Sequence, residues 1–293
     1  MIGVEGNRHR GAQAPAVRAY RIAYDGQPYH GFQRQPDVVT VEGTLLDALD
    51  TLDVIDSRKE IPPEYAAAGR TDAGVSALAQ TVAFDAPEWL TPAAFNSELP
   101  ASVRAWASAD APDGFHATHH ANSRTYTYLL HAPQAERAHA REFATRLSGE
   151  HDFHNLTPDE DGTVRDLTIS VERDGPFLVW TFRAGGFARQ LVRRLVGLLS
   201  ECLCGDAGPE RIDAALGPEP LSGPEGIAPA PPEPLVLTDV SYPSLDFVVD
   251  EEASRRTQEL FEQVRIERST GTRVAGILSE AGNTPAEIPE DSE

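Results

Sequence analysis

The sequence predicts an α+β protein whose two related halves share one extended sheet. In each half, segments with the alternating pattern of strands are interleaved with one or two helical segments, as in α+β units. The chain has 293 residues, enough for one large or two ordinary domains. In the second half, Asp174-Gly175 joins two alternating runs, which is a strong signal of a β-hairpin.

The first half is predicted to place two helices between two strands. A stripe of apolar residues every three or four positions predicts the first helix, and Thr40 is a suitable N-cap for it. Thr91-Pro92 marks the start of the second helix, since proline is favoured at the first helical position. The expected elements are strand 17–24, helix 41–54, helix 92–99 and strand 102–109.

The second half is predicted to be richer in strands. Its clearest helix covers 187–204, where an apolar stripe includes Leu191, Leu195 and Leu198, and Gly205 suits the C′ position. The expected elements are strand 123–130, helix 135–148, strands 168–173 and 177–184, helix 187–204, strand 235–242 and helix 250–268.

These elements divide the chain into four expected regions. The composition of each end differs from that of the middle. We expect a disordered leader at 1–16, an N-terminal α+β domain at 17–109, a C-terminal α+β domain at 110–245, and a charged helix with an acidic tail at 246–293.

The charge of the chain is strongly negative, with a formal net charge of −21 and 46 acidic residues. Net charge alone argues against a polyanionic partner. However, Lys59 is the only lysine, and an acidic excess with few lysines is typical of halophiles that accumulate salt, such as halophilic archaea. In such a protein the acidic surface serves solubility, so the local charge around a cleft indicates the ligand better than the net charge of the whole chain does.

The sequence predicts a cytoplasmic protein. No apolar run of about 18 residues or more would span a membrane, and the polar N-terminus lacks the apolar core of a secretion signal. Cys202 and Cys204 lie two apart in a predicted helix and therefore point to different faces. We expect both to be buried apolar side chains and not a disulfide or metal pair, which fits a reducing compartment.

The stretch Ala66–Phe84 is the leading candidate for a functional site. Its apolar flanks predict buried strands, and Gly69 and Gly74 bracket Arg70 and Asp72 on a tight loop between them. A loop on a rigid scaffold commonly presents reactive side chains. Alternatively, Asp72 caps a turn and Arg70 is a surface ion-pair partner, and the loop alone does not separate the two interpretations.

Two aromatic residues and one cation are further candidates. Tyr126 and Tyr128 lie two apart on a predicted strand, so both face one side, where a ring could stack on a base or pack in the core. Arg193 could turn toward Asp72 and keep its carboxylate ionised, although periodicity alone favours a helix-surface role. Histidine clusters at 116–120 and 151–154 suit packing and hydrogen bonding better than zinc.

Several motifs resemble those of one family. Ala66–Phe84 resembles the G-R-T-D-x-G-V-x-A catalytic motif of the tRNA pseudouridine synthase A (TruA) family. Five further segments resemble other family motifs in the same order, namely 19–35, 99–117, 124–128, 186–197 and 228–240. Together the matches cover roughly residues 17–243. The resemblance implies the pseudouridine synthase fold, with a mixed, mainly antiparallel sheet and a central active-site cleft.

The resemblance also implies a role for each candidate. Asp72 matches the catalytic aspartate, and Arg70 matches the arginine that enters the space left by the flipped nucleotide. Tyr126 matches the tyrosine that stacks on the target uracil, and Arg193 matches the cation paired with the aspartate. The sequence departs from the family pattern at Ser76, Thr118 and Ala188. These departures are expected to affect contacts with the substrate and packing, and not the catalytic aspartate.

The function implied is isomerisation of uridine to pseudouridine at positions 38–40 of the anticodon stem-loop of tRNA. The reaction needs no cofactor and no metal, and the family resemblance implies a homodimer that binds tRNA and no membrane. Alternatives are a synthase acting at other RNA sites, a non-catalytic RNA-binding module, and an aspartate-dependent glycosidase. The last normally needs a second carboxylate facing the first, and none is evident near Asp72.

Overall fold

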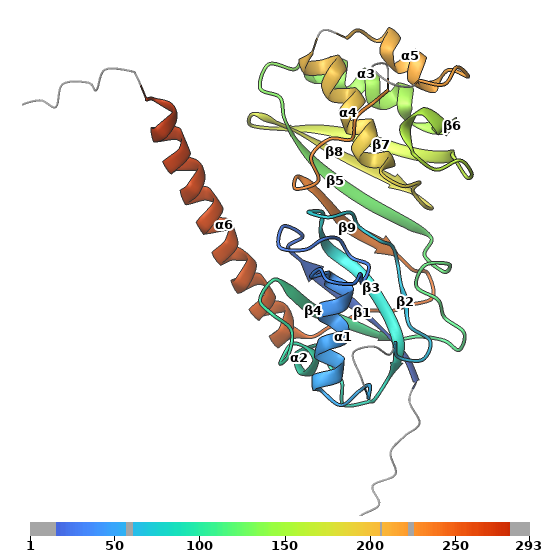
Figure 1. The fold of residues 1–293 in the computed structure, drawn as a ribbon, viewed down its shortest axis with the longest axis vertical. Coiled ribbons are helices and arrows are strands. Elements are labelled where there is room, and N and C mark those ends of the chain that lie inside the picture. Colours follow the sequence, from blue (N-terminus) through green and yellow to red (C-terminus); the bar gives the residue numbers. More distant parts are fainter. Residues whose placement is uncertain (1–15, 57–60, 206, 222–225, 282–293) are drawn as a thin grey trace, which may run out of the picture.

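We describe the protein from a computed structural model that covers residues 16–56, 61–205, 207–221 and 226–281 (Figure 1). The elements of the first half are β1 (Ala16–Tyr24), α1 (Val41–Thr51), β2 (Ala66–Ala67), β3 (Ser76–Ala86), α2 (Pro92–Phe95) and β4 (Val103–Asp110). Those of the second half are β5 (Ser123–His131), α3 (Arg137–Leu147), β6 (Gly149–Asp152), a 3-10 helix η1 (His154–Leu156), β7 (Val164–Asp174), β8 (Phe177–Ala184), α4 (Leu191–Cys204), α5 (Glu210–Leu216) and β9 (Leu235–Ser241). The chain continues into β10 (Val248–Val249) and α6 (Glu251–Ser279).

One sheet runs through both halves, in the strand order β10-β4-β1-β3-β9-β5-β8-β7-β6, with β2 beside β3. Among the described strands, β3 and β9 pair in parallel, and every other pair is antiparallel. The predicted α+β class with a mixed, mainly antiparallel sheet is therefore confirmed. Because β9 lies between β3 and β5, it joins the two halves at the centre of the sheet (Figure 1).

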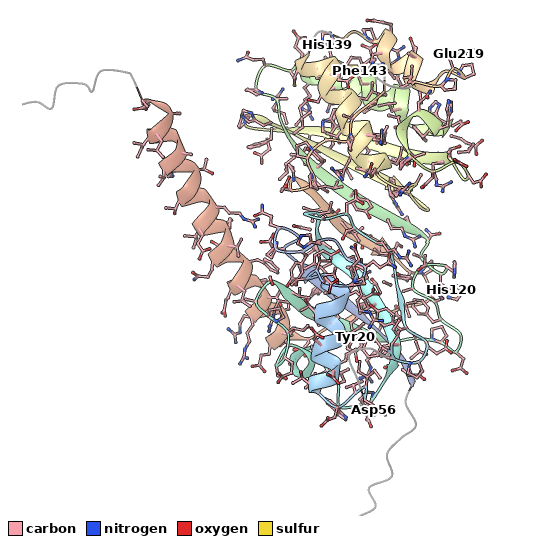
Figure 2. The ribbon with its side chains drawn as sticks, viewed as in Figure 1. Tyr20, Asp56, His120, His139, Phe143 and Glu219 are labelled. Carbon is pink, nitrogen blue, oxygen red and sulfur yellow. The ribbon has the colours of Figure 1, made fainter. Side chains whose placement is uncertain are left out.

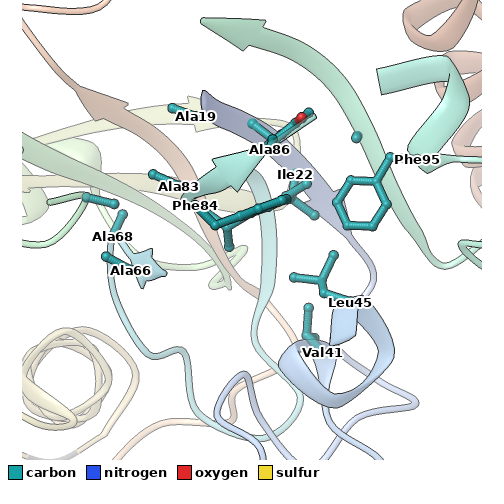
Figure 3. Packing of buried hydrophobic residues seen from close by; sticks show 14 of the residues in the cluster. Ala19, Ile22, Val41, Leu45, Ala66, Ala68, Ala83, Phe84, Ala86 and Phe95 are labelled. Carbon is teal, nitrogen blue, oxygen red and sulfur yellow. The ribbon is translucent and has the colours of Figure 1, made fainter. Parts of the chain in front are cut away.

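Each half buries a hydrophobic core of its own. In the first, Phe84 stacks on Tyr20 with ring centroids 5.2 Å apart, and α1 covers the sheet with its buried leucines (Figure 3). Ala66 pairs with Ala83 there, so the strand that leads to the Asp72 loop is anchored in this core. In the second, Trp180 is fully buried beneath α3 and α4, and Figure 2 places Phe143 of α3 in that region, far from Tyr20.

The predicted helices differ from the observed ones mainly at their ends. Helix 41–54 ends at Thr51, because Asp53 has a positive φ of 55° that a helix cannot continue through. Helix 92–99 is a single turn, Pro92–Phe95. Helix 187–204 begins only at Leu191, because Gln190 is left-handed with φ 59°.

At the other end of α4, Gly205 is not left-handed, since its φ is −108°. A Cβ at Gly205 would lie 2.7 Å from the Glu201 carbonyl oxygen, so close approach to the last turn explains the glycine. Cys202 is half-buried and Cys204 is exposed, and both are free thiols. The prediction that both are buried is therefore wrong for Cys204, which is exposed at the end of the helix.

Several elements were not predicted. The short strand β6, the 3-10 helix η1 and helix α5 lie in stretches too short and polar to show a clear period. The predicted helix 250–268 continues to Ser279, and its second part projects from the body of the protein (Figure 1). The predicted leader lies outside the described residues except for Ala16, and so does the tail from residue 282. None of the described helices is long and apolar enough to span a membrane.

Candidate active site

The Asp72 loop, defined as residues 68–75, connects β2 to β3, and several of its hydrogen bonds come from its own half of the protein. The hydroxyls of Tyr24 and Thr71 are hydrogen-bonded at 2.7 Å, and the Phe32 amide donates to the Thr71 carbonyl oxygen at 3.0 Å. Gln80 Nε2 donates to the Gly69 carbonyl oxygen at 2.9 Å. These bonds fix the main chain on both sides of Arg70, so the loop is rigid despite its glycines.

Two glycines around this loop are explained by the local structure, one by close packing and one by its backbone conformation. A Cβ at Gly26 would lie 2.1 Å from the Val75 carbonyl oxygen, so the turn after β1 can approach the loop only as glycine. Gly74 has a φ of +82°, a conformation that other residues rarely adopt. The loop therefore turns sharply just after Asp72 and leads directly into β3.

An ion pair crosses between the halves at Asp72. Arg193 Nη1 donates to Asp72 Oδ2 at 2.8 Å, across 121 positions of sequence. The Asp72 side chain is 31% exposed and that of Arg193 is 15% exposed, so the pair is screened from bulk water on one side only. The guanidinium compensates the charge of the carboxylate and fixes its orientation while leaving it reachable from the cleft.

The Arg193 side chain is itself held in place. Its Nε donates to the Ala230 carbonyl oxygen at 2.8 Å, and the Ala230 amide donates back to the Arg193 carbonyl oxygen at 2.9 Å. Helix α4 lies close to this segment, since a Cβ at Gly197 would meet the Ala228 carbonyl oxygen at 2.1 Å. The irregular segment before β9 thus aims Arg193 toward the Asp72 loop.

The two tyrosines of β5 have different surroundings. Tyr128 is buried in the core of the second half, and its hydroxyl donates to the Pro231 carbonyl oxygen at 3.2 Å. Tyr126 is half-buried, and the ring of Phe187 meets it edge-on at a centroid distance of 5.2 Å. Burial raises the pKa of Tyr126 to about 12, so its hydroxyl stays protonated at neutral pH. Tyr128 is therefore a core residue, whereas Tyr126 is half-buried and lines the cleft.

All four candidates, Asp72, Arg70, Tyr126 and Arg193, line one cleft of about 1140 Å³ between the halves. Arg70 is exposed there, and it has no ion-pair partner in the part of the chain that the structure describes. Four arginines and two acids line this cleft, although the whole chain is strongly acidic. The site thus combines a reactive carboxylate with a locally positive, partly aromatic surface suited to RNA.

Sequence reasoning missed one residue of the cleft. Arg124, two positions before Tyr126 on β5, donates from Nη2 to the Ala68 carbonyl oxygen at 2.8 Å. The family motif at 124–128 includes Arg124, but neither the motif nor the strand pattern shows what a long side chain reaches.

The histidines of the 116–120 cluster are used in local hydrogen bonds, since His116 Nδ1 accepts from the Thr118 amide at 3.2 Å. The His116 amide in turn donates to His120 Nδ1 at 2.9 Å. Within the described ranges, no three His, Cys, Asp or Glu side chains are grouped so that they could hold a metal ion.

Comparisons with known proteins agree closely with one another. A family model described as tRNA pseudouridine synthase matches residues 143–243. A tRNA pseudouridine synthase A of Haloarcula marismortui is 56% identical over 273 residues, which cover 90% of this chain and 99% of that protein. The protein of the same name from Halobacterium salinarum is 55% identical over 89% of this chain and 98% of its own length. A protein of that name from Methanothrix thermoacetophila is 39% identical over 83% of this chain and 89% of its own length.

Proposed function

The chain belongs to the tRNA pseudouridine synthase A family, and we propose that it isomerises uridine to pseudouridine in tRNA through the carboxylate of Asp72. The observation that carries the assignment of Asp72 is its 2.8 Å ion pair with Arg193 inside the cleft. Relatives of 55–56% identity come from archaea of the genera Haloarcula and Halobacterium, which agrees with the halophilic composition of this chain.

The reaction sets three tasks for the cleft. The bond from ribose C1′ to uracil N1 breaks, the uracil turns while it stays bound, and its C5 atom then bonds to C1′. The enzyme must first extract a stacked nucleotide, which costs a few kcal/mol. It must then hold the detached uracil, and it must assist the chemistry at the sugar or the base. C5 gives up its hydrogen as a proton and N1 gains one, so no atom is added or lost overall. The product has a C1′–C5 bond in place of C1′–N1 and a hydrogen on N1 in place of C5.

Each candidate residue suits one task. Asp72 is a compact carboxylate that can act as a nucleophile or base at the reacting nucleotide. Arg193 keeps that carboxylate oriented through the 2.8 Å ion pair. Tyr126, with its ring supported edge-on by Phe187, offers a face on which the uracil can stack while it turns. Arg70 is exposed on the same loop and lines the cleft, which supports a role in filling the space that the extracted nucleotide leaves.

The proposed substrate sites are uridines 38–40 of the anticodon stem-loop. Direct mapping of pseudouridine in host tRNA tests this, with the wild-type strain compared with a deletion strain and with the strain complemented by the gene. Loss of pseudouridine at 38–40 only in the deletion strain is expected. Loss at other positions instead would assign the enzyme to a different set of uridines.

A release assay separates isomerisation from hydrolysis. Purified protein is incubated at high salt with tRNA labelled in its uracil rings. We expect all label to remain in the RNA while pseudouridine accumulates. Free uracil in solution would instead show a glycosidase, and RNA binding without either product would show a non-catalytic module.

We further propose that the protein acts in the cytoplasm as a homodimer, as the family resemblance implies. Light scattering during size-exclusion chromatography at molar potassium chloride tests the oligomeric state at the concentrations used for activity. A mass of one chain with full activity would exclude the dimer.

A further inference from the structure

Arg124 stands out because all of its hydrogen-bonding capacity is used by main-chain carbonyl groups. Its Nε and Nη2 donate to the Ala68 oxygen at 3.3 and 2.8 Å, and Nη2 also donates to Thr118 at 2.5 Å. Its Nη1 donates to Gly185 at 2.6 Å and to Ala121 at 3.3 Å. A guanidinium has five N–H groups. These five bonds therefore leave Arg124 no free donor for RNA, although it lines the cleft.

The four carbonyl groups belong to three different parts of the cleft. Ala68 begins the Asp72 loop, and Thr118 and Ala121 lie in the segment between β4 and β5. Gly185 follows β8 and begins the stretch that leads to Phe187 and α4. Arg124 thus connects the loop that carries Asp72 with the chain that carries the partner ring of Tyr126.

This connection differs in origin from the other bonds to the loop. Tyr24, Phe32 and Gln80 hold the loop from within the first half. Arg124 reaches it from β5 of the second half, on the same strand face as Tyr126, since residues two apart share a face. The main-chain position of the Asp72 loop relative to Tyr126 therefore depends on Arg124.

We propose that Arg124 is a positioning residue of the reaction, which sets the distance between the Asp72 carboxylate and the uracil platform of Tyr126. This inference rests on the proposed function of the site. Lysine cannot replace arginine in this role, because a single ammonium group cannot reach carbonyl groups on several sides. A displacement of about 1 Å at reacting groups can lower a rate by roughly 100-fold.

The test is Arg124→Lys, measured by single-turnover pseudouridine formation with saturating enzyme at high salt, and by tRNA binding. We expect the rate constant to fall roughly 10- to 100-fold while the Kd for tRNA stays within about threefold. The matched control is Arg21→Lys. Arg21 is also buried and donates to the Ala79 and Val240 carbonyl oxygens, at 3.2 and 2.6 Å, but it does not line the cleft.

The control separates positioning from stability. Both variants are expected to melt at lower temperature, and only Arg124→Lys is expected to lose rate when both are assayed well below their melting temperatures. Equal rate constants for the two variants would overturn the proposal. A large rise in the Kd for tRNA in Arg124→Lys would also overturn it, because Arg124 would then contribute to RNA binding. An inactive wild-type protein would overturn the proposed function instead.

A second variant tests the same contact with less risk to folding. Thr118 Oγ1 donates to the Ala67 carbonyl oxygen at 2.5 Å, beside the carbonyl group that Arg124 holds. Thr118→Val should lower the rate constant slightly. In the double variant with Arg124→Lys, the fold-loss of rate should be smaller than the product of the two single fold-losses. Independent, multiplicative effects would contradict a shared role in placing the loop.

Discussion

The two walls of the cleft hold their functional side chains in different ways. The first wall is the Asp72 loop. Its main chain accepts hydrogen bonds from Phe32 and Gln80, and its Thr71 hydroxyl is bonded to the hydroxyl of Tyr24. The second wall consists of β5 and α4, regular elements that carry Tyr126 and Arg193. A loop needs bonds to its backbone at many points, whereas a helix or strand is positioned by packing along its whole length.

The two walls are therefore expected to contribute differently to the reaction. Asp72, the proposed catalytic residue, lies on the short loop, where a small change in main-chain path moves it. The residues that orient and support lie on elements that resist such changes. We therefore expect substitutions at the first wall to affect the chemical step most, and those at the second wall to have graded effects.

The largest effect is expected for Asp72→Asn. The amide is nearly isosteric but cannot act as a nucleophile or base, so single-turnover pseudouridine formation should fall by roughly 10³-fold or more. Binding of tRNA, measured by filter retention, should change little. The control is Asp159→Asn, because Asp159 also pairs with an arginine, Arg189, at 3.3 Å but does not itself line the cleft. Substantial turnover by the Asp72 variant would exclude the proposed mechanism.

A smaller loss is expected for Arg193→Lys. Hydrogen bonds to charged groups contribute about 1.5–3 kcal/mol, so loss of the 2.8 Å bond to Asp72 should lower the rate constant roughly 10- to 100-fold. Arg194→Lys is the matched control. Arg194 lies next on the same helix and donates to the Ile227 carbonyl oxygen at 2.6 Å, away from Asp72. Equal rate losses in the two variants would argue for a general effect on α4.

Substitution of Tyr126 separates its ring from its hydroxyl. Stacking on a base is worth about 1–3 kcal/mol, so Tyr126→Leu should weaken productive binding of the target nucleotide roughly 5- to 100-fold. Tyr126→Phe keeps the ring and should remain near wild-type in kcat/KM for tRNA. The control Tyr128→Phe removes the bond to Pro231 and should lower only the melting temperature. A strong rate loss in Tyr126→Phe would assign the hydroxyl a chemical role.

The smallest effect is expected for stability at alkaline pH. Burial raises the pKa of Tyr126 from 10.0 to about 12, so between these values the unfolded chain has lost a proton that the folded protein keeps. Stability therefore falls as pH rises through this window. Chemical denaturation at several pH values should show a slightly smaller alkaline loss in Tyr126→Phe than in the wild type. An unchanged pH slope would indicate that the ring is more solvated than its surroundings suggest.

Sequence reasoning succeeded best where the signal was local. The alternating runs predicted six of the long strands, and the glycine-flanked Asp72 loop is continuous in sequence. The α+β class and the shared sheet followed from the interleaving of helices and strands. These features depend on residues close together in the chain, where periodicity and turn chemistry are informative.

The rest depended on contacts between distant residues. Periodicity favoured Arg193 as a surface residue, because it cannot show that the segment at Ala230 turns the side chain toward Asp72. The same pattern could not tell Tyr126 from Tyr128, which share a strand face and differ only in what covers them. Arg124 is part of the matching motif at 124–128, but its role gave no signal, since its four acceptors are main-chain carbonyl groups whose positions the fold alone decides.

The central position of β9 has a consequence for how the protein is made. β9 is among the last strands to leave the ribosome, yet it fills the gap between β3 and β5, and Arg21 near the N-terminus donates to Val240, 219 positions later. Folding dominated by such distant contacts is slow. Until β9 emerges, β3 and β5 both expose unpaired edges, which invite aggregation in a nascent chain. Nascent chains that stop before Leu235 should therefore need chaperones most, and the cleft can form only at the end of synthesis.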